Sequence, residues 1–244
     1  TADKLTSWTA AQAVEWMDEC CIACAIGSVS NPGVWHGDIK AARRLSREWN
    51  EEAAKIVAEY PKRFGFFAVV APPDTEGALK EIEYALDTLK ADGIGLLSNY
   101  DATSLGDKKF MPVFEELQRR KAVVYVHPTR HDCTATLIPG LLPQGIEFPI
   151  DTTRTITSMV LNGVFAKTPD VKYIFSHGGG VLPFLAARIS HTGGRSPEFS
   201  ANNPRGVEHE LKRLYCDTAS AESAPQFAAM RAFFPASHIL YGSD

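Results

Sequence analysis

The sequence predicts a single α/β domain, residues 1–244, whose strands form one parallel sheet. Short apolar runs recur along the chain; most are rich in β-branched or aromatic residues and bounded by Gly, Pro, Asp or Asn, as strands are. Several are apolar throughout, which is typical of strands covered on both faces in a parallel sheet. We expect strands at residues 22–29, 64–70, 93–97, 123–127, 171–176, 213–216 and 239–241.

Helical patterns separate the expected strands. Asp38 is a candidate N-cap, and an apolar stripe at three- and four-residue spacing follows it until Pro61. Asp74 or Thr75 opens the next helix. Shorter stripes predict helices around residues 113–117 and 156–164. Strict alternation of strand and helix favours right-handed crossovers, in either an open doubly wound sheet or most of an eight-stranded barrel.

Composition excludes several classes of protein. The 244 residues are 45% hydrophobic and carry a net charge of −4 without an evident basic patch, so we expect no nucleic-acid partner. No apolar run approaches the roughly 20 residues of a membrane span, so we expect no membrane partner. Three of the five cysteines cluster at Cys20, Cys21 and Cys24. That usage is typical of free thiols in a reducing compartment, and we expect a cytoplasmic protein.

Polar residues stand where four of the expected strands end. These residues are His127, His177, Asp217 and Asp244. Ligands meet the C-terminal ends of the strands in both candidate architectures. Imidazole and carboxylate are normal zinc ligands, so the set indicates a divalent-metal site, although a single histidine at a strand end is more often structural. For Asp217, a loop cap and a pocket role are both open.

Several segments resemble the amidohydrolase-related family of metal-dependent barrels, in its branch of nonoxidative decarboxylases. The histidines lie in the motifs of residues 122–129 and 173–180, and residues 240–244 read Leu-Tyr-Gly-Ser-Asp. The stretch 95–106, with Leu-Leu-Ser-Asn-Tyr, is similar to 6-methylsalicylate and γ-resorcylate decarboxylases, and the branch also contains aminocarboxymuconate-semialdehyde decarboxylases. Residues 147–154 support the same branch. The resemblance covers nearly the whole chain.

The resemblance implies a (β/α)8 TIM barrel of the metal-dependent hydrolase type and a role for each matching residue. His127 and Asp244 would be metal ligands, with zinc expected and manganese as the alternative. His177 would act as an acid or base, and Asp244 could also carry a proton. Arg188 would reach a neighbouring subunit's site and bind a substrate carboxylate, which implies a homodimer or higher homo-oligomer. No organic cofactor is implied.

The expected activity is loss of carbon dioxide from a small hydroxylated aromatic or unsaturated carboxylic acid. Trp35, His36 and Asn99 lie in loops that should line the same rim, and we expect them to contact this substrate. The alternative enzyme is a metal-dependent hydrolase of a lactone or related bond, in which His177 would serve as the base.

The sequence also departs from the family pattern. The family's first strand carries His-x-His or Glu-x-His, and no such motif occurs here; residues 22–29 match the family's second strand. We therefore expect this chain to lack the first strand and the C-terminal helix of the barrel. This departure supports an alternative of another class, in which a truncated, non-catalytic barrel acts as a binding or assembly protein.

Overall fold

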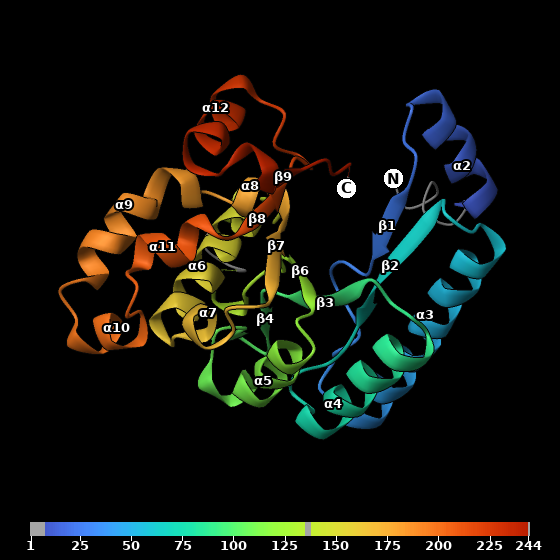
Figure 1. Ribbon diagram of the computed structural model, residues 1–244, viewed down its shortest axis with the longest axis horizontal. Helices are drawn as coiled ribbons and strands as arrows, with labels where there is room; N and C mark the ends of the chain where they lie inside the picture. Colours follow the sequence, from blue (N-terminus) through green and yellow to red (C-terminus); the bar gives the residue numbers. More distant parts are fainter. Residues whose placement is uncertain (1–7, 135–137, 244) are drawn as a thin grey trace.

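The computed structural model describes residues 8–134 and 138–243 and contains a seven-stranded parallel sheet. The strands are β1 (Ala25–Ser28), β2 (Phe64–Val69), β3 (Gly93–Leu97), β6 (Val123–His127), β7 (Lys172–Phe175), β8 (Tyr215–Asp217) and β9 (Ile239–Leu240). They lie in that order across the sheet, and every neighbouring pair is parallel. Figure 1 shows that the sheet curls and that the helices surround its outer side. All seven expected strands are thereby confirmed, with ends shifted by up to three residues.

The helices follow the strands as the alternating pattern predicts. They are α2 (Ala10–Glu19), α3 (Ile39–Glu59), α4 (Thr75–Glu83), α5 (Met111–Arg119), α6 (Glu147–Leu161), α7 (Val164–Lys167), α8 (Ser176–Gly179), α9 (Leu182–Gly193), α10 (Pro197–Asn202), α11 (Val207–Lys212) and α12 (Ala224–Phe233). No helix in the described part of the chain has the length and apolar character needed to cross a membrane.

Side-chain caps fix where α3 and α4 begin. The Asp38 carboxylate accepts a hydrogen bond from the Ala41 amide at the start of α3, as predicted. The Asp74 carboxylate accepts a hydrogen bond from the Gly77 amide of α4, so Asp74 is the N-cap and Thr75 is the first helical residue. Asp74 also pairs with Arg43 of α3, which ties the two helices together.

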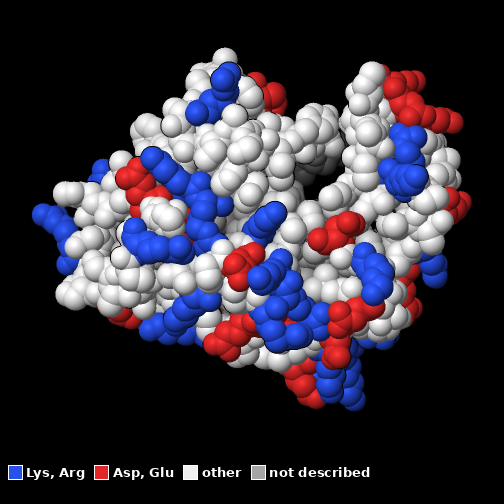
Figure 2. All heavy atoms as spheres, in the orientation of Figure 1, with Lys and Arg blue, Asp and Glu red and all other residues white. Residues whose placement is uncertain are grey.

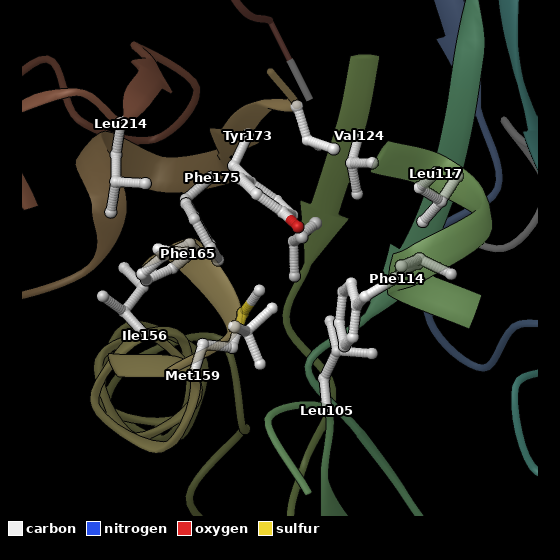
Figure 3. Packing of buried hydrophobic residues seen from close by; sticks show 14 of the residues in the cluster. Leu105, Phe114, Leu117, Val124, Ile156, Met159, Phe165, Tyr173, Phe175 and Leu214 are labelled. Carbon is white, nitrogen blue, oxygen red and sulfur yellow. The ribbon is translucent and has the colours of Figure 1, made fainter. Parts of the chain in front are cut away.

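The main apolar core lies between the outer face of the sheet and the helices. Alternate strand residues enter it, among them Val124 and Val126 of β6 and Tyr173 and Phe175 of β7. Figure 3 shows these aromatic rings packed against Phe165 and other side chains from the surrounding helices. Because successive strand residues point to opposite faces, the residues between them face the concave side of the sheet.

Glycines on β3 let aromatic residues meet across the concave face. Phe67 of β2 and Tyr125 of β6 stack with ring centroids 5.4 Å apart, although β3 lies between their strands. A Cβ at Gly93 would lie 3.0 Å from the Phe67 ring and 2.4 Å from the Val123 carbonyl oxygen. The Gly-x-Gly spacing of β3 therefore provides the space that the Phe67 side chain fills.

Three features of the fold differ from the sequence prediction. A small antiparallel hairpin, β4 (Asn99–Tyr100) with β5 (Thr103–Ser104), follows β3 and was not anticipated. Helix α6 begins at Glu147, nine residues before its expected start, and inside it the Thr153 and Thr157 hydroxyls donate to carbonyls one turn earlier. Three helices, α9, α10 and α11, lie in the interval before β8, where the alternating pattern predicts one.

Candidate active site

Two histidines face each other at the carboxyl ends of neighbouring strands. His127 is the last residue of β6, and His177 follows β7 by two residues. Their ring centroids are 5.2 Å apart with an interplanar angle of 76°, and the two residues are only 5% and 6% exposed. The structure therefore brings together two of the predicted site residues, as the register of β6 and β7 requires.

The His127 ring is oriented by its own backbone and by α6. Its Nδ1 lies 2.7 Å from the Pro128 carbonyl oxygen. Because a carbonyl only accepts, Nδ1 carries the proton and Nε2 carries the lone pair of the neutral ring. The Phe148 ring of α6 meets the imidazole edge to face at 6.0 Å. This tautomer is the one in which a histidine can bind a metal or accept a proton through Nε2.

His177 occupies a turn with left-handed backbone geometry. Its φ and ψ are 57° and 48°, and Gly178, Gly179 and Gly180 that follow also have positive φ. At Gly180 a Cβ would lie 2.2 Å from the Pro149 carbonyl oxygen of α6, so only glycine lets the turn approach this helix. The His177 Nδ1 donates to the Ala219 carbonyl at 3.0 Å, which again leaves the lone pair on Nε2.

Asp217 at the end of β8 holds this turn in place. Its Oδ1 accepts from the His177 amide at 2.8 Å and from the Ala219 amide at 3.1 Å, while Oδ2 accepts from the Tyr125 hydroxyl at 2.9 Å. Burial raises the pKa of this carboxyl, and the hydrogen bonds from His177 and Tyr125 oppose that shift. Both oxygens bond within the protein, which favours the loop-cap interpretation of Asp217.

The other predicted site residues lie in different settings. The Asn99 side chain is buried and donates to Asp151 and to the Thr129 carbonyl. Trp35 is half-buried and donates through Nε1 to Asp101 at 2.6 Å. His36 and Arg188 are exposed, Arg188 on α9. Asp244 lies outside the described residues.

Three buried or half-buried residues at this rim were not among those predicted. They are Ser98, Tyr125 and Asp151. Tyr125 stands two residues before His127 in the same strand, so period-2 alternation could have placed it on the concave face below the histidine. Asp151 stands between an apolar stretch, residues 148–150, and two threonines in α6, and a carboxylate buried in such a setting needs a polar partner.

The histidines provide only part of a metal-binding set. Within residues 8–134 and 138–243, no three His, Cys, Asp or Glu side chains cluster closely enough to hold an ion. His127 fits a metal through Nε2 because its tautomer is fixed by Nδ1. The Asp217 carboxylate instead accepts two amide hydrogen bonds on Oδ1 and the Tyr125 hydroxyl on Oδ2, so its bonds hold the turn that carries His177.

One pocket lies beside this rim, and another lies away from it. One of about 600 Å³ adjoins the segment after Asp217, and its lining includes Thr218, Phe227, Tyr241 and Gly242. The other, of about 330 Å³, lies between α3 and α4 and is crossed by the ion pair of Arg47 and Glu81, so we assign it to helix packing. Figure 2 shows a further open space between the parts of the chain that carry β1 and β9, bordered mainly by uncharged side chains.

Comparison with known proteins identifies the class to which this fold and rim belong. The amidohydrolase family model matches residues 25–244, so the chain belongs to the amidohydrolase family. An amidohydrolase II crystal structure superposes with a TM-score of 0.87 at 27% identity, covering 98% of this chain and 76% of that chain. The expected barrel class of fold is thus confirmed.

The relatives place the chain in the decarboxylase branch of this family, as the sequence motifs indicated. It is 38% identical to decarboxylase yanB of Aspergillus niger, over 98% of this chain and 69% of the relative. It is 36% identical to 6-methylsalicylic acid decarboxylase of Penicillium expansum, over 91% and 70%. Dihydroxybenzoic acid decarboxylase from a Polaromonas species, with bound manganese and 2-nitroresorcinol, is 26% identical with a TM-score of 0.86, covering 96% of this chain and 74% of that chain.

Proposed function

We propose that this chain is a metal-dependent nonoxidative decarboxylase of small hydroxylated aromatic carboxylic acids. The observation that carries the proposal is the His127–His177 pair, with both Nδ1 atoms bonded to carbonyls and both lone pairs on Nε2. The names of the relatives, which include 6-methylsalicylic acid and γ-resorcylate decarboxylases, support the reaction and the substrate class.

His127 and Asp244 would hold the divalent metal. Manganese bound to the Polaromonas relative supports such an ion, and zinc is the other candidate. When bound, the metal would supply positive charge that orients the acid and offsets its developing negative charge. His127 already has the tautomer that this role requires.

His177 would move the proton. Once Nε2 has taken up a proton from solvent, that proton would pass to the ring carbon that bears the carboxylate, the carbon–carbon bond would break, and carbon dioxide would leave as the bonding electrons return to the ring; Nε2 would regain its lone pair. Asp244 is a second candidate for this proton. The bond from Nδ1 to the Ala219 carbonyl steadies the ring, so that Nε2 is the only nitrogen available for transfer.

Arg188, Trp35, His36 and Asn99 remain proposed substrate contacts. An arginine suits a carboxylate because its planar fork can bond both oxygens. Arg188 is exposed on α9, which is consistent with a role in a neighbouring subunit of a homodimer or larger oligomer. Asn99 has both amide hydrogens engaged inside the protein and could offer substrate only its oxygen.

The test is turnover of 6-methylsalicylate and 2,6-dihydroxybenzoate by the chain loaded with manganese or zinc. Carbon dioxide and the matching phenol should appear in equal amounts. His177→Asn should lower kcat by about 100-fold or more, because positioned proton transfer contributes about 10²–10⁴-fold. His191→Asn, at an exposed histidine of α9, is the matched control.

Two outcomes would refute the proposal. A His177→Asn variant with the kcat of the control would remove the proton role. Turnover of a lactone with no carbon dioxide from any hydroxybenzoate would instead support the hydrolase alternative.

A further inference from the structure

Two sequence motifs that resemble the decarboxylases meet at one buried carboxylate. Asp151, in the second turn of α6, is 2% exposed. Its Oδ2 accepts hydrogen bonds from the Ser98 hydroxyl and from the Asn99 side-chain amide, the latter at 2.8 Å. The segment after β3 and the start of α6 are more than fifty residues apart in the chain, and this carboxylate joins them.

The same two residues hold the backbone that follows His127. The Ser98 hydroxyl accepts from the Thr129 amide at 2.9 Å, and the Asn99 amide also donates to the Thr129 carbonyl at 3.2 Å. The Ser98 amide donates to the His127 carbonyl at 3.0 Å. The chain is therefore fixed on both sides of Pro128, whose own carbonyl orients the His127 ring.

Ser98 is held by hydrogen bonds from its backbone and from its side chain. It is fully buried, and the Thr155 hydroxyl of α6 donates to its carbonyl at 2.7 Å. The amide, carbonyl and hydroxyl of Ser98 are thus all bonded, and both bonds to α6 depend on the position of that helix. Such a satisfied network fixes one geometry, because each lost bond would leave a buried polar group unpaired.

The Asp151 carboxylate acts mainly as a hydrogen-bond acceptor and not as the anion of an ion pair. Its nearest described cation, Arg154, is half-exposed and lies 3.9 Å from Oδ1, which is the oxygen that Ser98 and Asn99 do not use. An amide at this position could keep both acceptor bonds through its oxygen, whereas a methyl group could keep neither.

We propose that Asp151 is a positioning residue: through Ser98 and Asn99 it fixes the segment from His127 to Thr129, and so directs the His127 imidazole toward His177. The inference rests on the proposed function for its catalytic consequence. It also predicts a change in the His127 ring that does not depend on any activity.

The experiment compares Asp151→Ala with Asp151→Asn in the full chain. Asp151→Ala should lower kcat for 6-methylsalicylate by about 10- to 100-fold, as loss of an outer partner of a site histidine does, with KM within about threefold. Asp151→Asn should stay within about threefold of the unmodified chain. Asn203→Ala removes another buried side chain with two hydrogen bonds, one of them to the Val160 carbonyl at the other end of α6, and should lower stability while leaving kcat unchanged.

A second measurement follows the histidine rings by NMR in the metal-free chain, with the His127 signal assigned from a His127→Gln variant. Asp151→Ala should shift or broaden that signal and leave the exposed His191 signal in place. Ser98→Ala keeps the Asp151 carboxylate but removes the hydroxyl that lies between it and the Thr129 amide. It should also shift or broaden the His127 signal, and it replaces Asp151→Ala in the experiment if that variant does not fold.

Three results would overturn the inference: an unmoved His127 signal in both folded variants, a loss of kcat no larger than that of Asn203→Ala, or equal losses for the Ala and Asn variants. If the unmodified chain releases no carbon dioxide, the proposed function fails, and the His127 signal still decides the role of Asp151.

Discussion

Tyr125→Phe removes one hydroxyl from the support of His177 and leaves the ring that stacks on Phe67. The lost bond is the 2.9 Å hydrogen bond from the Tyr125 hydroxyl to the Asp217 carboxylate, which is 4% exposed. A hydrogen bond to a charged group contributes about 1.5–3 kcal/mol, and a buried acceptor left without it retains its desolvation cost. We expect the free energy of unfolding at pH 8 to fall by about 2 kcal/mol.

The pH dependence of this loss follows from the pKa of Asp217. Burial raises that pKa in the folded state, so the carboxyl favours folding at pH values below its unfolded pKa, and this contribution is lost as pH rises through the folded pKa. The Tyr125 bond opposes the shift, because it stabilises the ionised form. Removal of the hydroxyl should therefore lower the free energy of unfolding more at pH values above the pKa of this carboxyl than at pH values below it.

The assay is urea-induced unfolding of the unmodified chain and the variant at several pH values from 4.5 to 8. Tyr173→Phe is the matched control, because its buried hydroxyl bonds to the neutral Thr168 hydroxyl at 2.8 Å. The control should lose about 1 kcal/mol at every pH. A Tyr125→Phe loss that is independent of pH, or larger in acid, would show that the hydroxyl does not stabilise an ionised Asp217.

Three further predictions concern the metal, the backbone and the thiols. His127→Ala should lower the manganese or zinc bound per chain in elemental mass spectrometry, and unchanged metal content would contradict the ligand assignment. Gly180→Ala should lower the free energy of unfolding by about 3 kcal/mol or more, because the added Cβ would collide with the Pro149 carbonyl and alanine is strained at a φ of 68°. Gly37→Ala is the control, since Gly37 has a φ of 80° but open space around it, and it should lose about 1 kcal/mol. Thermal unfolding of both variants would measure the difference. Iodoacetamide at pH 8 should modify the four exposed cysteines but not Cys216, because burial raises the pKa of that thiol to about 12; intact mass would reveal a fifth adduct if this is wrong.

The sequence was most informative where the structure is local. Asp38 caps α3 as expected because an N-cap bonds an amide three residues away. His127 and His177 were placed on one rim because parallel strands end at the same side of a sheet. Asp151 and Tyr125 were missed because their partners lie more than fifty and ninety residues away, and no local pattern specifies which side chains tertiary packing will bring together.

The two histidine segments are held by different buried carboxylates, and this difference suits the two roles proposed for the histidines. His127 depends on the segment after β3 and on α6, through Ser98 and Asp151. His177 depends on β8, through Asp217. The two supports also meet, because Tyr125 of β6 bonds Asp217 and the Thr153 hydroxyl of α6 accepts a hydrogen bond from the Val181 amide after the glycine turn. A residue that holds a metal has to stay fixed, whereas one that transfers a proton has to tolerate a change of charge. Because Asp151 and Asp217 hold the two histidine segments through separate hydrogen bonds, each requirement has a carboxylate of its own.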